Sequence, residues 1–214
     1  MNNIVEMIYD KHIGNYYAIR GNKSNKAFKN PMTACKLVKL NCDDVVVDIG
    51  AFVGEYSLLA SSIAKKVISY EASPETFKVL KMNQKQNMEI FNKAVVGGNE
   101  ATIELFLSKG IGATNSVVKS KGKASAVKVD AINYVEAVRN ATVVKIDVEG
   151  AEYSYDIIQP NLRAIILEFH PIVGCDWKKN AQDIMKKLIR SGFQPLMIPK
   201  FQNGWDTNSS WVKI

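Results

Sequence analysis

The chain has 214 residues, 47% of them hydrophobic and 23% charged, and a formal net charge of +7. This composition is typical of a folded domain and excludes a disordered chain. No apolar run approaches the roughly 20 residues of a membrane-spanning helix, the N-terminus does not resemble a secretory signal, and three cysteines without a Cys-x-x-Cys pair indicate neither a disulfide framework nor a zinc site. We expect a cytoplasmic protein with one domain over residues 1–214.

The first 40 residues are basic, with seven lysines or arginines against two acidic residues. A second basic segment, residues 109–128, has five lysines and no acidic residue. Two such segments predict an anionic partner, nucleic acid included, although lysines that only keep the protein soluble form the same pattern. We expect residues 1–40 to form short helices packed on one edge of the domain.

From residue 45 onward, short runs of β-branched residues alternate with helical patterns. This alternation predicts a doubly wound α/β fold with a mostly parallel sheet. Strands are expected at 45–50, 66–72, 90–97, 142–148, 163–169, 193–199 and 209–214. Helices are expected at about 55–64, from Ser73 onward, at 133–140, after GAEY and at 178–191.

Residues 101–132 interrupt the alternation. TIELFLS (102–108) and SAVKVDAI (125–132) have the pattern of two antiparallel strands, joined by the basic stretch KGIGATNSVVKSKGK. That stretch has too little apolar content to pack, so we expect a mobile loop. The segment as a whole predicts a β-hairpin inserted after the third strand.

The stretch VVVDIGAFVGEYS predicts a ligand-binding turn between a buried strand and a helix. A dinucleotide site needs a glycine two residues after Gly50, but Phe52 stands there and would block the pyrophosphate. A Walker A loop needs a Lys-Ser or Lys-Thr pair after Gly54. Glu55 and Tyr56 follow it instead, and a carboxylate at a helix start repels phosphate.

Two carboxylates favour a ligand that has a cationic end and no phosphate. Asp48 precedes the turn, and Glu71 ends the second strand, where an acidic residue accepts hydrogen bonds from both ribose hydroxyls. S-adenosylmethionine fits this pair, because Asp48 could hold its ammonium group directly or through water. The alternative is an ordinary strand–turn–helix connection with a capping Asp.

Five stretches resemble the FkbM-type methyltransferases in their order along the chain. They are VVVDIGAFVGEYS, YEASPETFKVLKMN, VKVDAINY, VVKIDVEGAEY and IILEFHP, and together they span residues 44–171. The resemblance implies a class I S-adenosylmethionine-dependent enzyme, most often an O-methyltransferase, with a Rossmann-like seven-stranded sheet whose final strand is antiparallel. Two positions depart from the family pattern: Ala72 replaces a proline, and Phe52 stands where asparagine is common.

The turn and the resemblance together predict a binding site for S-adenosylmethionine, with S-adenosylhomocysteine as the product. The residues assigned to it surround three strand ends. They are Asp48, Gly50, Ala51, Phe52, Gly54, Tyr56, Ser57, Glu71, Ala72, Ala94 and Asp147.

A second group of polar residues lies in KIDVEG and LEFHP, at the ends of two strands that should be neighbours. Because side chains alternate along a strand and carboxyl ends of strands form the ligand crevice, these residues should converge. They are Asp147, Glu149, Glu168 and His170. Transfer to an alcohol requires removal of its proton. We predict Asp147 at the transfer site and His170 as general base, with Glu168 orienting His170 or binding a substrate hydroxyl.

Other interpretations of this group stay open. The cluster could hold a divalent metal that lowers the pKa of the hydroxyl, although no metal ligand set is predicted. His170 could be only a hydrogen-bonded strand end, and Glu149 only part of a tight turn. Glu152 could serve only the first turn of the next helix.

Three further features bear on the acceptor atom. Lys145 is expected to point away from Asp147, near the start of its strand or paired. The Lys-Asp-Lys-Glu tetrad of many ribose-methylating enzymes cannot be assembled, because Glu168 stands where its second lysine is expected. The Asn/Asp-Pro-Pro-aromatic motif of amine-directed enzymes is absent, and DVEG stands in its place. An oxygen acceptor is therefore favoured over a nitrogen acceptor.

The acceptor itself stays open, because residues 1–40 and 172–214 lie outside the matching stretches and such segments usually select the substrate. A hydroxyl of a saccharide or another small molecule is the first hypothesis. A ribose hydroxyl of RNA, contacted through the two basic segments, is the alternative. A non-catalytic binding module that keeps the fold is the third.

Overall fold

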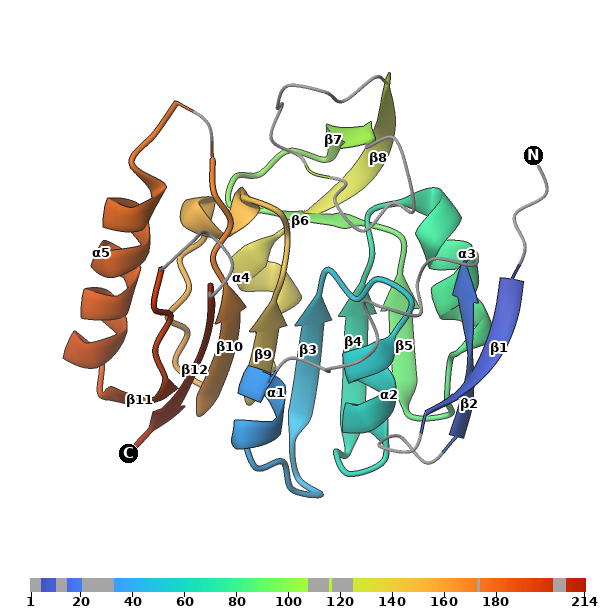
Figure 1. Cartoon of the computed structure of the whole chain (residues 1–214), viewed down its shortest axis with the longest axis horizontal. Coiled ribbons are helices and arrows are strands. Elements are labelled where there is room, and N and C mark those ends of the chain that lie inside the picture. Colours follow the sequence, from blue (N-terminus) through green and yellow to red (C-terminus); the bar gives the residue numbers. More distant parts are fainter. Residues whose placement is uncertain are drawn as a thin grey trace.

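The computed structural model describes residues 5–10, 15–20, 33–107, 116, 125–172, 174–201 and 207–214. The strands of its central sheet are β3 (Val45–Ile49), β4 (Lys66–Tyr70), β5 (Met88–Phe91), β9 (Val143–Ile146), β10 (Ala164–Glu168), β11 (Phe193–Met197) and β12 (Asn208–Lys213). Their order is β11-β12-β10-β9-β3-β4-β5 (Figure 1). β12 is antiparallel to both neighbours, whereas the other neighbouring strands are parallel. The predicted seven-stranded, mostly parallel sheet is confirmed.

Helices cover both faces of this sheet. Successive residues of a strand point to opposite faces, and since both sets are mostly apolar here, each face has to be buried. The helices are α1 (Thr33–Leu37), α2 (Glu55–Ser61), α3 (Pro74–Met82), α4 (Tyr134–Ala137), α5 (Trp177–Arg190) and the 3-10 helix η2 (Ala151–Ser154). Val46 packs in a hydrophobic cluster with α1, α2 and α3, whereas Val47 packs in another with α4, η2 and α5. Among the helices of the described ranges, none is both long and apolar enough to pass through a membrane.

The third strand expected at 90–97 is divided into two strands. β5 belongs to the central sheet, but β6 (Ala94–Val96) leaves it and pairs with the insertion. Between them, the side-chain amide of Asn92 donates hydrogen bonds to the backbone carbonyl oxygens of Glu71 (2.8 Å) and Ala72 (3.1 Å). These bonds hold the chain where it bends out of the central sheet. The hydrophobic pattern of residues 90–97 gives no sign of this bend.

The β-hairpin insertion after the third strand is confirmed. β7 (Thr102–Leu107) and β8 (Ser125–Asn133) are antiparallel, and β6 pairs with β8 in parallel, so a separate sheet has the order β6-β8-β7. Figure 1 shows this sheet above the carboxyl ends of the central strands. Of the predicted mobile loop, Ser116 alone lies within the described residues, where it bridges to Phe106.

The start of the chain differs from the short helices expected there. β1 (Val5–Asp10) and β2 (Asn15–Arg20) form an antiparallel hairpin, and β2 lies against α3 (Figure 1). In the described part of residues 1–40, helix is confined to α1. The β-branched and aromatic residues of VEMIYD and NYYAIR favour strands, and this signal outweighs the polar composition around them.

The helix expected after GAEY is shortened to the four residues of η2. Tyr155 follows with an extended backbone (φ −86°, ψ 143°). Its hydroxyl donates a hydrogen bond to the carbonyl oxygen of Val95 (2.9 Å), and its ring stacks on Tyr134 with 4.7 Å between centroids. Burial of this tyrosine in the core takes the chain out of the helical conformation.

The turn between β3 and α2 brings Gly50 against the end of β9. Gly50 has a φ of +77°, and a Cβ atom here would lie 1.8 Å from the backbone carbonyl oxygen of Asp147. The amides of Gly50 and Ala51 both donate to the carbonyl oxygen of Tyr70 at 3.0 Å, which fastens the turn to β4. Close packing of strand ends therefore requires this glycine, whereas the sequence suggested the close approach of a ligand.

We predict that Gly50→Ala lowers the free energy of unfolding by about 3 kcal/mol, because the methyl group meets a rigid carbonyl in a left-handed conformation. Gly192→Ala is the matched control: its φ is +85°, but nothing lies within 4 Å of the new Cβ atom. Only left-handed strain remains there, about 1–2 kcal/mol. Urea denaturation measures both values, and equal losses would contradict the packing explanation.

Candidate active site

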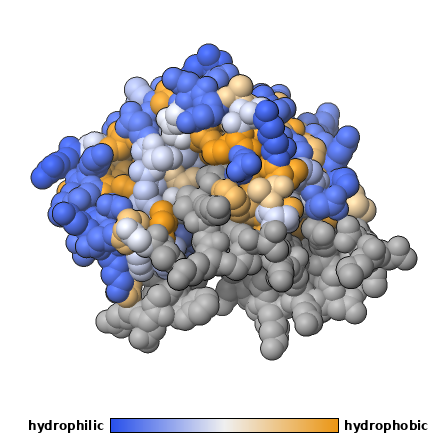
Figure 2. Space-filling model, turned by 90° about the horizontal axis from the view of Figure 1, so that it is seen from above, coloured by the Kyte–Doolittle hydropathy of each residue, from blue (hydrophilic) through white to orange (hydrophobic). Residues whose placement is uncertain are grey.

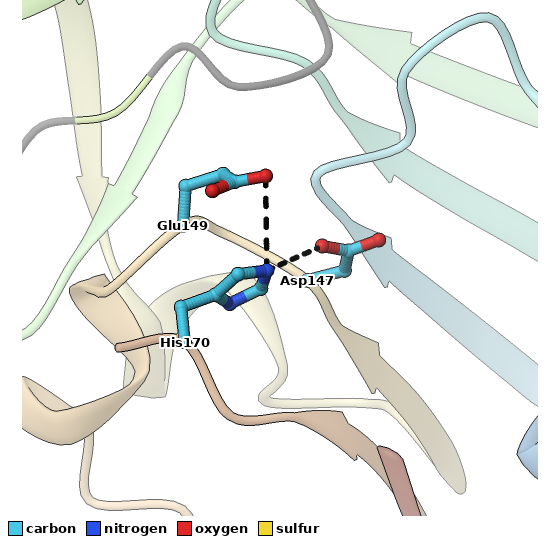
Figure 3. Close-up of side chains that lie close together, drawn as sticks. All are labelled: Asp147, Glu149 and His170. Carbon is cyan, nitrogen blue, oxygen red and sulfur yellow. Dashed lines mark ion pairs between the residues drawn. The ribbon is translucent and has the colours of Figure 1, made fainter. Parts of the chain in front are cut away.

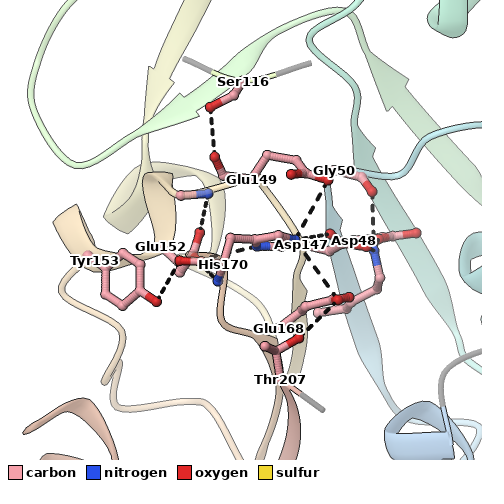
Figure 4. A network of polar contacts seen from close by, with 12 residues as sticks. Asp48, Gly50, Ser116, Asp147, Glu149, Glu152, Tyr153, Glu168, His170 and Thr207 are labelled. Atoms are coloured by element: carbon pink, nitrogen blue, oxygen red, sulfur yellow. Dashed lines mark hydrogen bonds and ion pairs between the residues drawn. The ribbon is translucent and has the colours of Figure 1, made fainter. Parts of the chain in front are cut away.

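Four side chains predicted for the site come together at the carboxyl ends of β9 and β10, beside the β3–α2 turn (Figure 4). Nε2 of His170 lies 3.5 Å from Oδ1 of Asp147 and 3.7 Å from Oε1 of Glu149. Oε1 of Glu168 is 4.0 Å from the same nitrogen. Three carboxylates from two neighbouring strands thus surround one edge of the imidazole.

His170 is held in place by two residues of η2. Oε1 of Glu152 accepts a hydrogen bond from the amide of His170 (2.7 Å) and lies 3.3 Å from Nδ1 of the ring. The hydroxyl of Tyr153 donates to the carbonyl oxygen of His170 (2.9 Å). Glu152 is fully buried, and its other oxygen accepts from the amide of Gly150 (2.8 Å). Glu152 thus fastens the backbone of His170 and lies closer to its ring than Glu168 does.

The carboxylates around His170 favour its positively charged form. Burial lowers the pKa of this histidine, but Glu152, Asp147 and Glu149 together raise it to about 9. The imidazole is therefore protonated at neutral pH, and it must lose this proton before it can act as a base or a metal ligand. The carboxylates beside Nε2 thus stabilise positive charge at this edge of the ring.

Lys145 is a central residue of the site that the sequence analysis misjudged. Its Nζ lies 3.2 Å from Oδ1 of Asp48 and 3.4 Å from Oδ2 of Asp147, and it donates a hydrogen bond to the carbonyl oxygen of Gly50 (3.1 Å). The expectation that Lys145 points away from Asp147 is wrong, because residues two apart in a strand share a face. Burial lowers the pKa of Lys145, but the two carboxylates raise it overall.

Asp48 is a buried residue of β3 that supports the following turn through its side chain. Its side chain is 1% exposed, and Oδ2 accepts a hydrogen bond from the hydroxyl of Ser57 (2.6 Å) while Oδ1 faces Lys145. The direct contact with a ligand ammonium that the sequence suggested does not fit this geometry, because both carboxylate oxygens face buried protein groups. The side chain of Asp147 is 30% exposed, so Asp147 is the acid that faces outward.

Glu71 braces the same turn from β4. Its Oε2 accepts a hydrogen bond from the amide of Phe52 (2.9 Å), and its Oε1 accepts one from the amide of Ser73 (2.8 Å). The first bond steadies Phe52 at a φ of +53°, which residues other than glycine rarely adopt. Burial raises the pKa of Glu71 to about 7, although both hydrogen bonds oppose this. The folded state therefore holds this proton more tightly than the unfolded state, and this contribution to stability falls as pH rises from about 4.5 to about 7.

The remaining positions assigned to the cofactor differ in exposure. Ala72 is partly exposed beside the turn, as are Gly50 and Phe52. Tyr56 is a core residue that packs in the cluster with α1 and α2, and its hydroxyl has no hydrogen-bond partner among the described residues. The buried positions are Ala51, Gly54, Tyr56, Ser57 and Ala94. Ala51 and Tyr56 pack in the core beneath the turn, whereas Ala94 packs with β7 and β8 of the insertion.

Three of the clustered side chains could together hold a metal ion (Figure 3). Asp147, Glu149 and His170 each offer one ligand atom, and these atoms all lie within 4.8 Å of one another. Glu149 has a φ of +54°, and the hydroxyl of Ser116 donates to its carbonyl oxygen (2.7 Å). A residue of the insertion thus holds Glu149 in a strained conformation with its carboxylate toward His170.

The match to a known family decides the class of protein. The model of the methyltransferase FkbM domain matches residues 48–195, more than half of the chain. The chain belongs to the FkbM methyltransferase family. Membership confirms the resemblance seen in the sequence, and S-adenosylmethionine stays the methyl donor that this resemblance implies.

Solved structures with the same fold are distant in sequence. An FkbM methyltransferase from Methylobacillus flagellatus KT has 14% identity and a TM-score of 0.54, over 82% of this chain and 45% of that chain. TYW2 from P. horikoshii, solved in complex with MeSAdo, has 15% identity and a TM-score of 0.52, over 99% and 70%. The chain thus spans less than half of the first of these proteins, and such identities show the fold alone. Among curated proteins, none matches the sequence.

We predict that the affinity of this FkbM methyltransferase for S-adenosylhomocysteine falls about tenfold from pH 8 to pH 6. The reason is that Glu71, with a pKa of about 7, loses its charge over this range, and this charge is expected to attract the ribose hydroxyls. Calorimetry at several pH values measures the effect. Glu71→Gln should bind weakly and without this pH dependence, whereas Glu136→Gln, an exposed control on α4, should behave like the unchanged protein. An identical pH profile in Glu71→Gln would exclude Glu71 as the titrating group.

Proposed function

We propose that the protein transfers the methyl group of S-adenosylmethionine to a hydroxyl oxygen of a saccharide or another small molecule. The observation that carries this proposal is the cluster at the carboxyl ends of β9 and β10, in which carboxylate oxygens of Asp147, Glu149 and Glu168 lie 3.5, 3.7 and 4.0 Å from Nε2 of His170. An alcohol has to lose its proton during methylation, and this cluster offers proton acceptors beside the turn expected to hold the cofactor.

The cofactor would lie across the β3–α2 turn, with its ribose toward Glu71 and its cationic end toward Asp147. Two features support this placement. The carboxyl edge of a doubly wound sheet is where such folds bind their ligands. The partly exposed Asp147 also links the turn to the cluster. It contacts His170 on one side, and on the other it contacts Lys145, which binds Asp48 and Gly50. The sulfonium methyl would then point at the acceptor site.

Transfer itself is an in-line displacement, for which the protein must hold the acceptor oxygen against the methyl carbon. Proton removal falls to the cluster: the neutral form of His170 can accept the proton at Nε2, and so can the carboxylate of Glu168. Asp147 and Glu149 stabilise the positive charge that gathers there. The sulfonium loses its positive charge during transfer. The proton that leaves the acceptor adds a positive charge to the same group of carboxylates, so the charge of the site is maintained.

We predict that His170→Ala lowers kcat by at least about 100-fold, because the cluster loses its central group. The dissociation constant for S-adenosylmethionine should change by less than about twofold, since His170 lies on the acceptor side. Single-turnover kinetics and calorimetry separate the two effects. Glu136→Gln serves as the control with both values unchanged, and normal turnover of the true acceptor by His170→Ala would contradict the assignment.

A nucleic-acid acceptor is the second candidate, favoured by one described surface. Helix α5 carries five exposed basic side chains, and the left of Figure 2, where α5 lies in Figure 1, is largely hydrophilic. They are Lys178, Lys179, Lys186, Lys187 and Arg190. Most of the basic side chains in residues 1–40 and 109–128 lie outside the described residues.

Salt dependence separates the two acceptors. For a neutral saccharide, we predict that the KM for the acceptor changes by less than about twofold between about 50 and 200 mM salt. An RNA bound through six or more phosphate contacts would lose about 1,000-fold in affinity over this range, because counterions compete for the phosphates. Replacing the α5 residues Lys179 and Lys187 with alanine would reduce that slope for RNA and leave a saccharide unaffected.

A further inference from the structure

We propose that Asp147, Glu149 and His170 bind one divalent cation, Mg²⁺ or Mn²⁺, and that this cation holds the acceptor hydroxyl and makes it more acidic. The inference rests on the proposed transfer to oxygen and adds a metal to it. It also gives His170 one role, that of a metal ligand through Nε2.

The spacing of the three side chains fits a cation between them. Nε2 of His170 lies 3.5 Å from Asp147 and 3.7 Å from Glu149, longer than the roughly 2.7–3.2 Å of an N–H···O hydrogen bond. Ligand atoms about 2.1 Å from an octahedral cation are about 3.0 Å apart when adjacent. A small closure of the cluster brings the atoms to that spacing, and Figure 3 shows both carboxylates turned toward the same imidazole nitrogen.

The support behind His170 is the second observation, independent of the two acids. Glu152 is fully buried, and its Oε1 lies 3.3 Å from Nδ1, so a proton on Nδ1 faces a carboxylate. A histidine that ligates a metal usually has its other nitrogen beside such a carboxylate, which fixes the ring and the tautomer. The His170 side chain is 12% exposed, and its second nitrogen is aimed into the cluster. When a cation displaces the proton of Nε2, the lone pair of this nitrogen faces the cation position.

The excess of negative charge in the site also favours binding of a cation. Five carboxylates surround two basic groups, Lys145 and His170, and each of the five lies within 4.0 Å of one of them. The five are Asp48, Asp147, Glu149, Glu152 and Glu168. The two carboxylates are ligands that both Mg²⁺ and Mn²⁺ prefer, and the imidazole favours Mn²⁺, the transition metal of the two. Such a cation balances the two ligating carboxylates and keeps coordination positions for hydroxyl oxygens, which a polyhydroxylated acceptor such as a saccharide supplies.

The step balances as follows. The acceptor hydroxyl binds the cation through oxygen, its pKa falls, and its proton passes to the carboxylate of Glu168, which lies beside the three ligands. The oxygen forms a bond to the methyl carbon as the carbon–sulfur bond breaks, and that electron pair stays on sulfur. The products are the methyl ether and S-adenosylhomocysteine. Glu168 then releases its proton to solvent, and the cation is unchanged.

The test is a titration of the full chain with Mn²⁺ after removal of metals with EDTA, followed by calorimetry and electron paramagnetic resonance, with neither cofactor nor acceptor present. We expect one Mn²⁺ per chain. Glu149→Gln and Asp147→Asn should each weaken Mn²⁺ binding by about 100-fold, at least as much as loss of a supporting group. Glu136→Gln should leave it unchanged. Thermal unfolding of each variant shows whether it is folded.

The outcomes separate this inference from the proposed function. Absence of saturable Mn²⁺ binding, or equal binding by folded Glu149→Gln and Asp147→Asn, overturns the metal site. Methylation of a hydroxyl acceptor at full rate in excess EDTA also overturns it and leaves O-methyl transfer standing. Stoichiometric Mn²⁺ binding that is lost in both variants supports the site, even where a screen of hydroxyl acceptors yields no product and so counts against the proposed function.

Discussion

The buried ammonium of Lys145 is the interaction on which the site depends. It lies between Asp48 of β3 and Asp147 at the end of β9, and it also donates to the carbonyl oxygen of Gly50 in the β3–α2 turn. A buried charge costs several kcal/mol unless partners surround it, so these groups are held together by the need to satisfy it. The parallel register that sets Lys145 beside Asp48 makes this contact unavoidable. One charge thus joins the turn expected to hold the cofactor to the acid expected at the transfer site.

The part of the site expected to bind the acceptor is organised by one short segment, DVEGAEY (147–153). Within a few residues it supplies Glu149, which faces the site, and Glu152, which turns inward to hold the backbone and ring of His170. The tight turn at Glu149 and Gly150 makes this possible, since both have positive φ angles. Ser116 fastens the turn from the inserted hairpin. The insertion is therefore part of the site, because it sets the conformation of one acidic residue.

Much of the fold could be predicted from the sequence, because burial on both faces leaves a strong signal in the parallel strands. The errors fall where tertiary contacts overrode local pattern. Asn92 takes the chain out of the sheet by hydrogen bonds to Glu71 and Ala72, and Tyr155 ends a helix by entering the core. At the site, the four convergent residues followed from strand alternation. The same rule, applied to Lys145, would have placed it beside Asp147.

The sequence by itself determined the family, the doubly wound sheet and the set of acids and histidine at its carboxyl edge, because these depend on motif order and on the two-residue repeat of strands. Only the tertiary structure decided which of these groups face one another. It turned Asp48 inward to Lys145, and it made Glu152 the support of His170. The reason is physical: the partner of a buried charged group comes from another part of the chain, and the local sequence pattern does not show which group that is.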